Sequence, residues 1–129
     1  LADLQNLDPS YANLTGAVLR NANLAAAVLS GAKLTGEGIR GAILQGALLR
    51  NGNLVGAVLS TSSLTDANIR GAILQGVLLR NANLMGTVLS RANLTDADVR
   101  DAVLKTIWNT GTIYCNTKTN WGIENRDCP

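Results

Sequence analysis

Few residues in this 129-residue chain could do chemistry, because it contains no histidine. Without an imidazole there is no Ser–His–Asp triad, no Cys–His pair and no histidine ligand for a metal. The densest acidic group is formed by Asp96, Asp98 and Asp101 around Arg100. Carboxylates this close can perform acid–base catalysis or bind calcium. The repeat described below places them on an open outer surface, so we expect a solvated charge cluster and no catalytic or metal site.

The two cysteines, Cys115 and Cys128, lie 13 positions apart. Two cysteines without a histidine do not make a zinc site, and the spacing is not the Cys-x-x-Cys of redox enzymes. We expect a structural disulfide that stabilises the C-terminal segment by about 3 kcal/mol. The bond favours an oxidising compartment, the periplasm or the thylakoid lumen, and without it we expect the cytoplasm. The chain begins at Leu1 with no signal peptide, so any export signal is expected to have been removed or to lie outside this sequence.

Composition and motifs also argue against several other classes of protein. The 11 Lys and Arg residues against 9 Asp and Glu give a net charge of +2, too balanced for a nucleic-acid-binding polycation. No run of about 18 apolar residues is present, so we expect no membrane span. Residues 36–41 match G-x-G-x-x-G, but the helix that a dinucleotide site requires is not predicted after them. We expect one domain without a cofactor.

A five-residue repeat organises the chain from residue 2 to residue 106. Starting at Leu4, 20 of the 21 positions spaced five apart are aliphatic, and Pro9 is the exception. Two residues before these central positions the chain carries Ala in 15 of 21 cases. Two residues after them it carries Gly, Asn or Asp in 16 of 21 cases. Three coincident registers indicate a repeat architecture.

This period fits neither a helix nor a flat strand. Five residues rotate an α-helix by roughly 500°, so the aliphatic residues would form no stripe. In a strand an odd period sends alternate residues to opposite faces. A short extended piece followed by a corner satisfies the pattern, because Gly, Asn and Asp tolerate a positive φ at the corner. Four corners close a square of about 20 residues, which predicts about five stacked coils with the Leu and Ala rows inside.

The units also resemble a known family. Ala12-Asn13-Leu14 and Ala82-Asn83-Leu84 follow the A(N/D)LXX signature of the pentapeptide repeat family, and such units cover about four fifths of the chain. The resemblance implies an all-β fold, the right-handed quadrilateral β-helix. The tail through Cys128 is similar to the C-terminal caps of cyanobacterial members. The small inward residue is replaced at five positions: Leu7, Glu37, Val77, Thr87 and Ile107. Among these, Glu37 would be costly because it would bury a carboxylate inside the coil.

The two ends interrupt the pattern. Residues 1–11 are expected to form an irregular lead-in, residues 2–106 the repeat, and residues 107–129 a C-terminal cap. The cap must cover the apolar interior and the strand edges of the last coil, and we assign this role to its aromatic residues Trp108, Tyr114 and Trp121. The short N-terminal lead-in is thin cover, so the chain is expected to be a monomer or a weak end-to-end homodimer through its N-terminal end.

One face of the predicted solenoid could bind a partner protein. Positions 20 apart stack, and this places arginines and outward aliphatic residues on one face: Arg20, Arg40, Arg80, Arg100, Val18, Val58 and Leu78. Such a face could bind an acidic strip of a partner. An ordinary solvated wall whose arginine stems cover apolar neighbours is the alternative.

The sequence therefore predicts a non-enzymatic structural or protein-interaction scaffold with an unknown protein partner. It predicts no nucleic-acid or membrane partner. The resemblance suggests one alternative, because some family members are long, acidic, dimeric mimics of DNA that inhibit DNA gyrase. This chain is short, carries a net charge of +2 and has arginines on its predicted faces, so the phosphate-like field of a mimic is missing.

Overall fold

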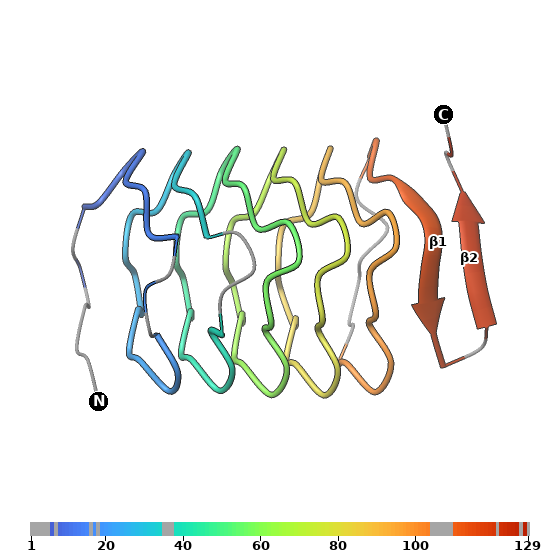
Figure 1. Cartoon of the computed structure of the whole chain (residues 1–129), viewed down its shortest axis with the longest axis horizontal. Helices are drawn as coiled ribbons and strands as arrows, with labels where there is room; N and C mark the ends of the chain where they lie inside the picture. The colour runs from blue at the N-terminus through green and yellow to red at the C-terminus, as the bar shows by residue number, and fades with distance from the viewer. Residues whose placement is uncertain are drawn as a thin grey trace.

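The computed structural model describes residues 6, 8–15, 17, 19–34, 38–103, 110–120, 122–126 and 128. Their backbone winds into square coils stacked along one axis, from the blue N-terminal end to the red C-terminal end in Figure 1. Parallel bridges join residues that lie one coil apart, such as Asn53 with Ile73 and Leu78 with Asp98. Within these residues no helix has the length and apolar character needed to cross a bilayer.

The bridging residues point outward and form four walls. Each wall is named here after one member: the Asn53 wall (Asn13, Lys33, Asn53, Ile73, Asn93, Ile113), the Leu78 wall (Gly38, Val58, Leu78, Asp98, Lys118), the Ser63 wall (Asn23, Ile43, Ser63, Asn83, Val103) and the Leu48 wall (Val28, Leu48, Asn68, Val88). Because each residue in a wall bridges its neighbours one coil away, side chains in a row are held at one coil spacing, about 4.8 Å.

Tight turns make the corners between walls. At one corner the Ala57 N–H donates to the Leu54 carbonyl at 3.0 Å, and Gly56 between them has a φ of +66°. Asn51 and Asp66 occupy the same turn position at +55° and +56°. Glycine has no penalty there, and Asn and Asp tolerate the left-handed region better than other residues do. The predicted positive φ at the corners is confirmed.

The Asn of the repeat has a structural role of its own. Asn53 Oδ1 accepts the backbone N–H of Val55 at 3.2 Å, and Asn93 Oδ1 accepts that of Thr95 at 2.9 Å. This local turn of the Asx type satisfies a donor as the chain enters the corner. It explains why Asn or Asp precedes the central Leu.

The Leu and Ala rows form one continuous core inside the coils, as predicted. Leu54, Ala57 and Leu59 are fully buried, and the exposed fraction of the buried apolar side chains does not exceed 7%. Two of the replaced small residues, Val77 and Thr87, also lie inside, at 0% and 5% exposed. The predicted disturbance at Glu37, and the fates of Leu7 and Ile107, lie outside the described residues. Alternating large and small side chains fills the narrow interior to the density of a protein core.

An antiparallel hairpin closes the C-terminal end (Figure 1). Its strands are β1 (Tyr114–Thr119) and β2 (Gly122–Arg126). One edge of β1 continues the last coil, since Lys118 bridges Asp98, and β2 pairs with the other edge. The stacking therefore extends beyond residue 106, where the sequence pattern ends. The strand β2 covers a row of backbone groups that would otherwise be open to pairing.

The predicted disulfide is present, because Cys115 and Cys128 are bonded, with their Cα atoms 4.9 Å apart. It links the start of β1 to the residues after β2. Tyr114 is half-buried and packs against the core, and its capping role stays a prediction. The other two cap residues, Trp108 and Trp121, lie outside the described residues.

Candidate functional site

The filled interior offers no site in the part of the chain that the structure describes. Where polar side chains do point inward, the previous coils satisfy them: the Thr112 hydroxyl donates to the Leu89 carbonyl and the Thr117 hydroxyl to the Leu94 carbonyl, both at 2.8 Å. The same described residues hold no group of acidic, histidine or cysteine side chains arranged for a metal ion. The exposed polar and charged side chains of the described residues lie on the outer walls and corners.

The three aspartates do not form one cluster. Asp96 accepts the Asn116 side-chain amide at 2.6 Å, and the backbone N–H of Asp101 donates to Asn120 Oδ1 at 2.6 Å. These contacts occupy different corners. Asp98 lies on the Leu78 wall and is only 6% exposed, so the expectation of a solvated carboxylate is wrong for this residue. A guanidinium two residues further on covers it.

Arg100 and Asp98 form a two-point ion pair. The guanidinium donates from Nε to Oδ1 at 2.8 Å and from Nη2 to Oδ2 at 2.6 Å. These bonds lower the pKa of Asp98 against the opposing effect of burial, and the carboxylate raises the pKa of Arg100. A carboxylate that stays ionised this firmly is unsuited to accept or deliver a proton near neutral pH. The pair is therefore structural.

The Leu78 wall and the corner after it bring together most of the predicted partner face. Arg20, Arg40 and Arg80 are exposed there, Leu78 is 40% exposed, and Val58 is half-buried; Val18 lies outside the described residues. Arg80 lies near enough to Asp98 to contribute to its lowered pKa. The C-terminal half of this wall is therefore partly neutralised. Across the described residues, Arg20 and Arg40 have no carboxylate in ion-pair contact.

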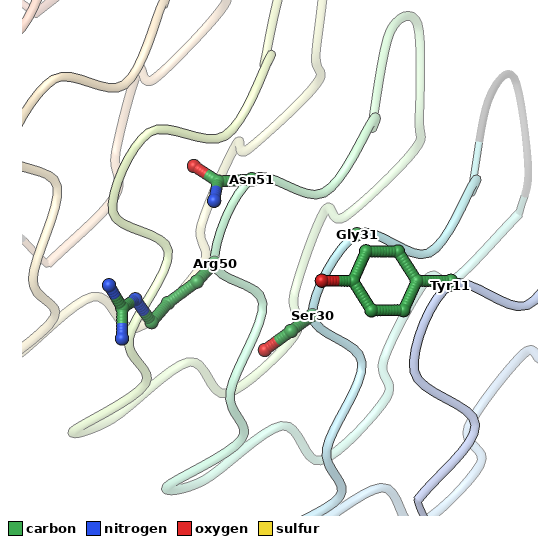
Figure 2. Close-up of a pocket in the computed structure, with 5 residues that line it drawn as sticks. All are labelled: Tyr11, Ser30, Gly31, Arg50 and Asn51. Carbon is green, nitrogen blue, oxygen red and sulfur yellow. The ribbon is translucent and has the colours of Figure 1, made fainter.

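The diagonally opposite corner follows the Leu48 wall and is called here the Arg50 corner. It consists of two positions in each coil: Ser10, Ser30, Arg50, Arg70, Ser90 and Thr110, followed by Tyr11, Gly31, Asn51, Gly71, Arg91 and Gly111. Near its N-terminal end Tyr11, Ser30, Gly31, Arg50 and Asn51 line a hollow of about 260 Å³ (Figure 2). Sequence reasoning missed this hollow. The available signal was an aromatic residue, Tyr11, in a register dominated by Gly, Asn and Asp.

Known proteins share these features. A family model described as pentapeptide repeats matches residues 2–36, 42–81 and 74–105, in 8 copies. The chain belongs to the pentapeptide repeat family. Its fold is accordingly the right-handed quadrilateral β-helix that the A(N/D)LXX resemblance implied. Members of the family generally serve as structural or interaction scaffolds rather than as enzymes.

Solved structures agree with this assignment. HetL, a pentapeptide repeat protein involved in heterocyst differentiation regulation in Nostoc sp. strain PCC 7120, is 30% identical with a TM-score of 0.76 over 90% of this chain. A second Nostoc PCC 7120 pentapeptide repeat protein is 30% identical with a TM-score of 0.51, the match covering 88% of this chain and 84% of that one. A thylakoid-lumen member from Arabidopsis thaliana is 26% identical with a TM-score of 0.56, the match covering 84% and 72%.

The match to HetL covers 51% of that protein, so this chain spans about half of its length. A search of curated protein sequences returns no match. The comparisons therefore establish the fold and the family.

Proposed function

We propose that the chain is a non-enzymatic, rigid scaffold that binds a partner protein through the Leu78 wall and the arginines of the adjoining corner. The observation that carries the proposal is that the partly exposed aliphatic side chains of the Leu78 wall lie beside the corner of Arg20 and Arg40, which have no acidic partner among the described residues. An acidic strip on a partner would neutralise these cations while covering Val58 and Leu78.

The rigidity of the wall supports this role. Asn21 N–H donates to the Arg40 carbonyl at 3.0 Å, which ties the backbones of neighbouring arginine positions together. Ile39, beneath the wall, is 0% exposed and anchors it from inside. Side chains fixed to such a wall lose little backbone freedom when a partner binds, which favours affinity.

The test replaces Arg20 and Arg40 with serine, the residue that the chain itself carries at position 60 of the same row. Partners are captured by cross-linking from extracts of cells that express the protein. Loss of a specific partner with Arg20→Ser/Arg40→Ser, and its retention by the matched Arg50→Ser/Arg70→Ser variant on the opposite corner, is the expected outcome. Equal recovery with both variants and the parent protein would show that the Leu78 wall is not the docking surface.

Inhibition of DNA gyrase by DNA mimicry is disfavoured by the distribution of charge. The acidic residues at Asp66, Asp96, Asp98 and Asp101 are dispersed over separate corners and one wall, and Asp98 is already paired. A duplex-like surface requires continuous rows of negative charge. We expect no change in gyrase supercoiling at stoichiometric protein, measured by gel mobility of plasmid DNA. Clear inhibition would contradict this assignment.

We further propose weak end-to-end association through the N-terminal coil. Its central residue Leu14 and the small residues Ala12 and Ala17 are half-buried, whereas Leu34 and Ala32 one coil further on are 1% and 0% exposed. Apolar surface left open at a solenoid end favours association of copies. Sedimentation velocity over a concentration series should show a dimer at high concentration. A strict monomer throughout would remove this part of the proposal.

A further inference from the structure

Tyr11 is an anomaly among the corner residues. It has a φ of +60° and is 81% exposed, although bulky residues rarely occupy the left-handed region. The coil holds it there, because its N–H donates to the Ser30 carbonyl at 2.8 Å and the following turn closes with a bond from Ala12 N–H to the Pro9 carbonyl at 3.0 Å. An exposed aromatic side chain on a strained backbone is typical of a functional position.

Gly31 provides a seat for the Tyr11 ring. A Cβ atom added at Gly31 would lie 2.5 Å from Cδ1 and 2.6 Å from Cε1 of Tyr11, so the bare glycine permits the ring to lie against the next coil. Figure 2 shows the ring beside Gly31 with its hydroxyl pointing toward the coil that carries Arg50 and Asn51. Two coils further on the arrangement recurs, because the Asn51 side chain lies over Gly71. The missing side chain at Gly31 therefore provides the space that the Tyr11 ring occupies.

Polar side chains line the hollow. Within the described residues, the Tyr11 hydroxyl, the Ser30 hydroxyl and the Arg50 guanidinium have no side-chain partner. In Figure 2 the Arg50 side chain extends away from Tyr11 and Ser30, and its exposed position leaves room for it to turn toward them. All three groups can donate hydrogen bonds, and an anionic acceptor satisfies them together.

Positive charge continues along the Arg50 corner. Arg50, Arg70 and Arg91 occupy three successive coils, and Lys33 projects from the adjoining Asn53 wall. Over the described residues of this corner and the two walls beside it, Asp8 is the single acidic residue, and its carboxylate already accepts the Ser10 hydroxyl and N–H. Because the partly neutralised Leu78 wall lies on the other side of the molecule, this corner is a separate basic ridge.

We propose that the hollow binds the carboxylate side chain of an acidic residue on a partner protein, and that Arg70 and Arg91 bind further acidic residues of the same extended segment. The volume of about 260 Å³ is smaller than the usual range for small-molecule sites and accommodates one side chain. The methylene groups of that side chain pack on the Tyr11 ring, and the carboxylate accepts from Tyr11, Ser30 and Arg50. Arg50 and Arg91 lie two coils apart, about 10 Å. Side chains on the same face of an extended peptide repeat about every 6.6 Å, so two of them fit within that length.

The test uses a fluorescein-labelled peptide with Glu at alternate positions and Gly between, and an otherwise identical Gln peptide. Binding is measured by anisotropy and by amide chemical shifts of the whole chain. The variants copy residues that the chain already carries in the same register: Arg50→Ser follows Ser30 and Ser90, and Tyr11→Gly follows Gly31. Both variants should fold. Each should lower the affinity for the Glu peptide about tenfold or more, which is the effect of losing one charge-assisted hydrogen bond or one packed ring.

Three controls separate this site from general charge attraction. Arg20→Ser/Arg40→Ser, which alters the other proposed docking surface, should leave the chemical-shift changes at the Arg50 corner in place. The Gln peptide should not bind, and the affinity of Tyr11→Phe should fall between that of the parent protein and that of Tyr11→Gly. Chemical-shift changes at the Arg50 corner should be lost in Arg50→Ser. The proposal is overturned if the Arg20/Arg40 variant removes the shifts at the Arg50 corner as Arg50→Ser does, if inorganic phosphate displaces the peptide from this corner at equal concentration, or if no shifts appear there at millimolar peptide.

Discussion

The inward and outward rows of one coil obey different rules, although they alternate along the same backbone. Leu54 points inward and is 0% exposed, whereas Val55 next to it is 37% exposed. Inside, the coils hold mainly large aliphatic and small residues, because the neighbouring coils leave little other space. The buried Thr87, Thr112 and Thr117 bond to carbonyls of the previous coil. Outside, Asn, Lys, Ile, Asp and Val alternate in single walls without disturbing the backbone. The interior residues therefore determine the fold, and the exterior residues are the ones available for a function.

The largest expected effect comes from a substitution in an inward-pointing row. Leu54→Ala should lower the free energy of unfolding by about 4 kcal/mol, because it leaves a cavity between coils that cannot collapse. The matched outward change, Val55→Ala, should cost less than about 0.5 kcal/mol. Equilibrium urea unfolding measures both. Equal losses at the two positions would contradict the distinction between inside and outside.

The disulfide extends the comparison to the C-terminal cap, where no five-residue repeat operates. Replacing Cys115 and Cys128 by Ala should lower stability by about 3 kcal/mol, because the unfolded chain regains the freedom that a closed loop of this length removes. In this variant the amides of β1 and β2 should exchange hydrogen faster than in the parent protein, and the change should be larger there than in the central coils. Unchanged protection of the hairpin would show that pairing alone holds the cap.

Substitutions at the corners test whether contacts between corner side chains contribute to stability. Gly71 and Gly76 have nearly equal φ values, +68° and +67°, but an added Cβ would strike Asn51 Oδ1 at Gly71 and meet nothing within 4 Å at Gly76. Gly76→Ala should therefore cost about 1 kcal/mol from backbone strain alone. Gly71→Ala should cost about 2 kcal/mol, and Asn51→Ala should reduce the difference between the two. Identical costs in urea unfolding would show that contacts between corner side chains do not matter.

The smallest expected effect concerns Asp98, an outward residue that has become buried. Arg100 holds the pKa of Asp98 below its ordinary value of 3.8, so the carboxylate binds a proton more readily in the unfolded chain than in the folded one. The stabilisation by this carboxylate is therefore present above about pH 4 and is lost as the pH falls through the lowered value. Asp98→Asn should flatten the acid limb of a stability–pH profile. A limb as steep as that of the parent protein would contradict the ion pair.

Sequence reasoning predicted the fold and missed most of the surface, for a physical reason. The core residues Leu54 and Ala57 repeat in register because each sees the same neighbours, so their pattern can be read without coordinates. The ion pair at Asp98 occurs once among the described residues, and the hollow at Tyr11 does not follow the five-residue repeat. They depend on which residue lies one coil away, as Gly31 does for Tyr11, and on side-chain rotamers that no periodicity encodes. The disulfide was predictable because the chain has two cysteines and no competing ligand.

A scan of introduced cysteines tests the central claim most directly, because both native cysteines are in the disulfide and a single new thiol is the reactive one. Leu54→Cys and Ala57→Cys should react with a thiol reagent only after denaturation, since the parent side chains are 0% exposed. Val55→Cys should react at once in the native protein. Rapid native-state labelling at position 54 or 57 would contradict a coil whose Leu and Ala rows fill its own interior.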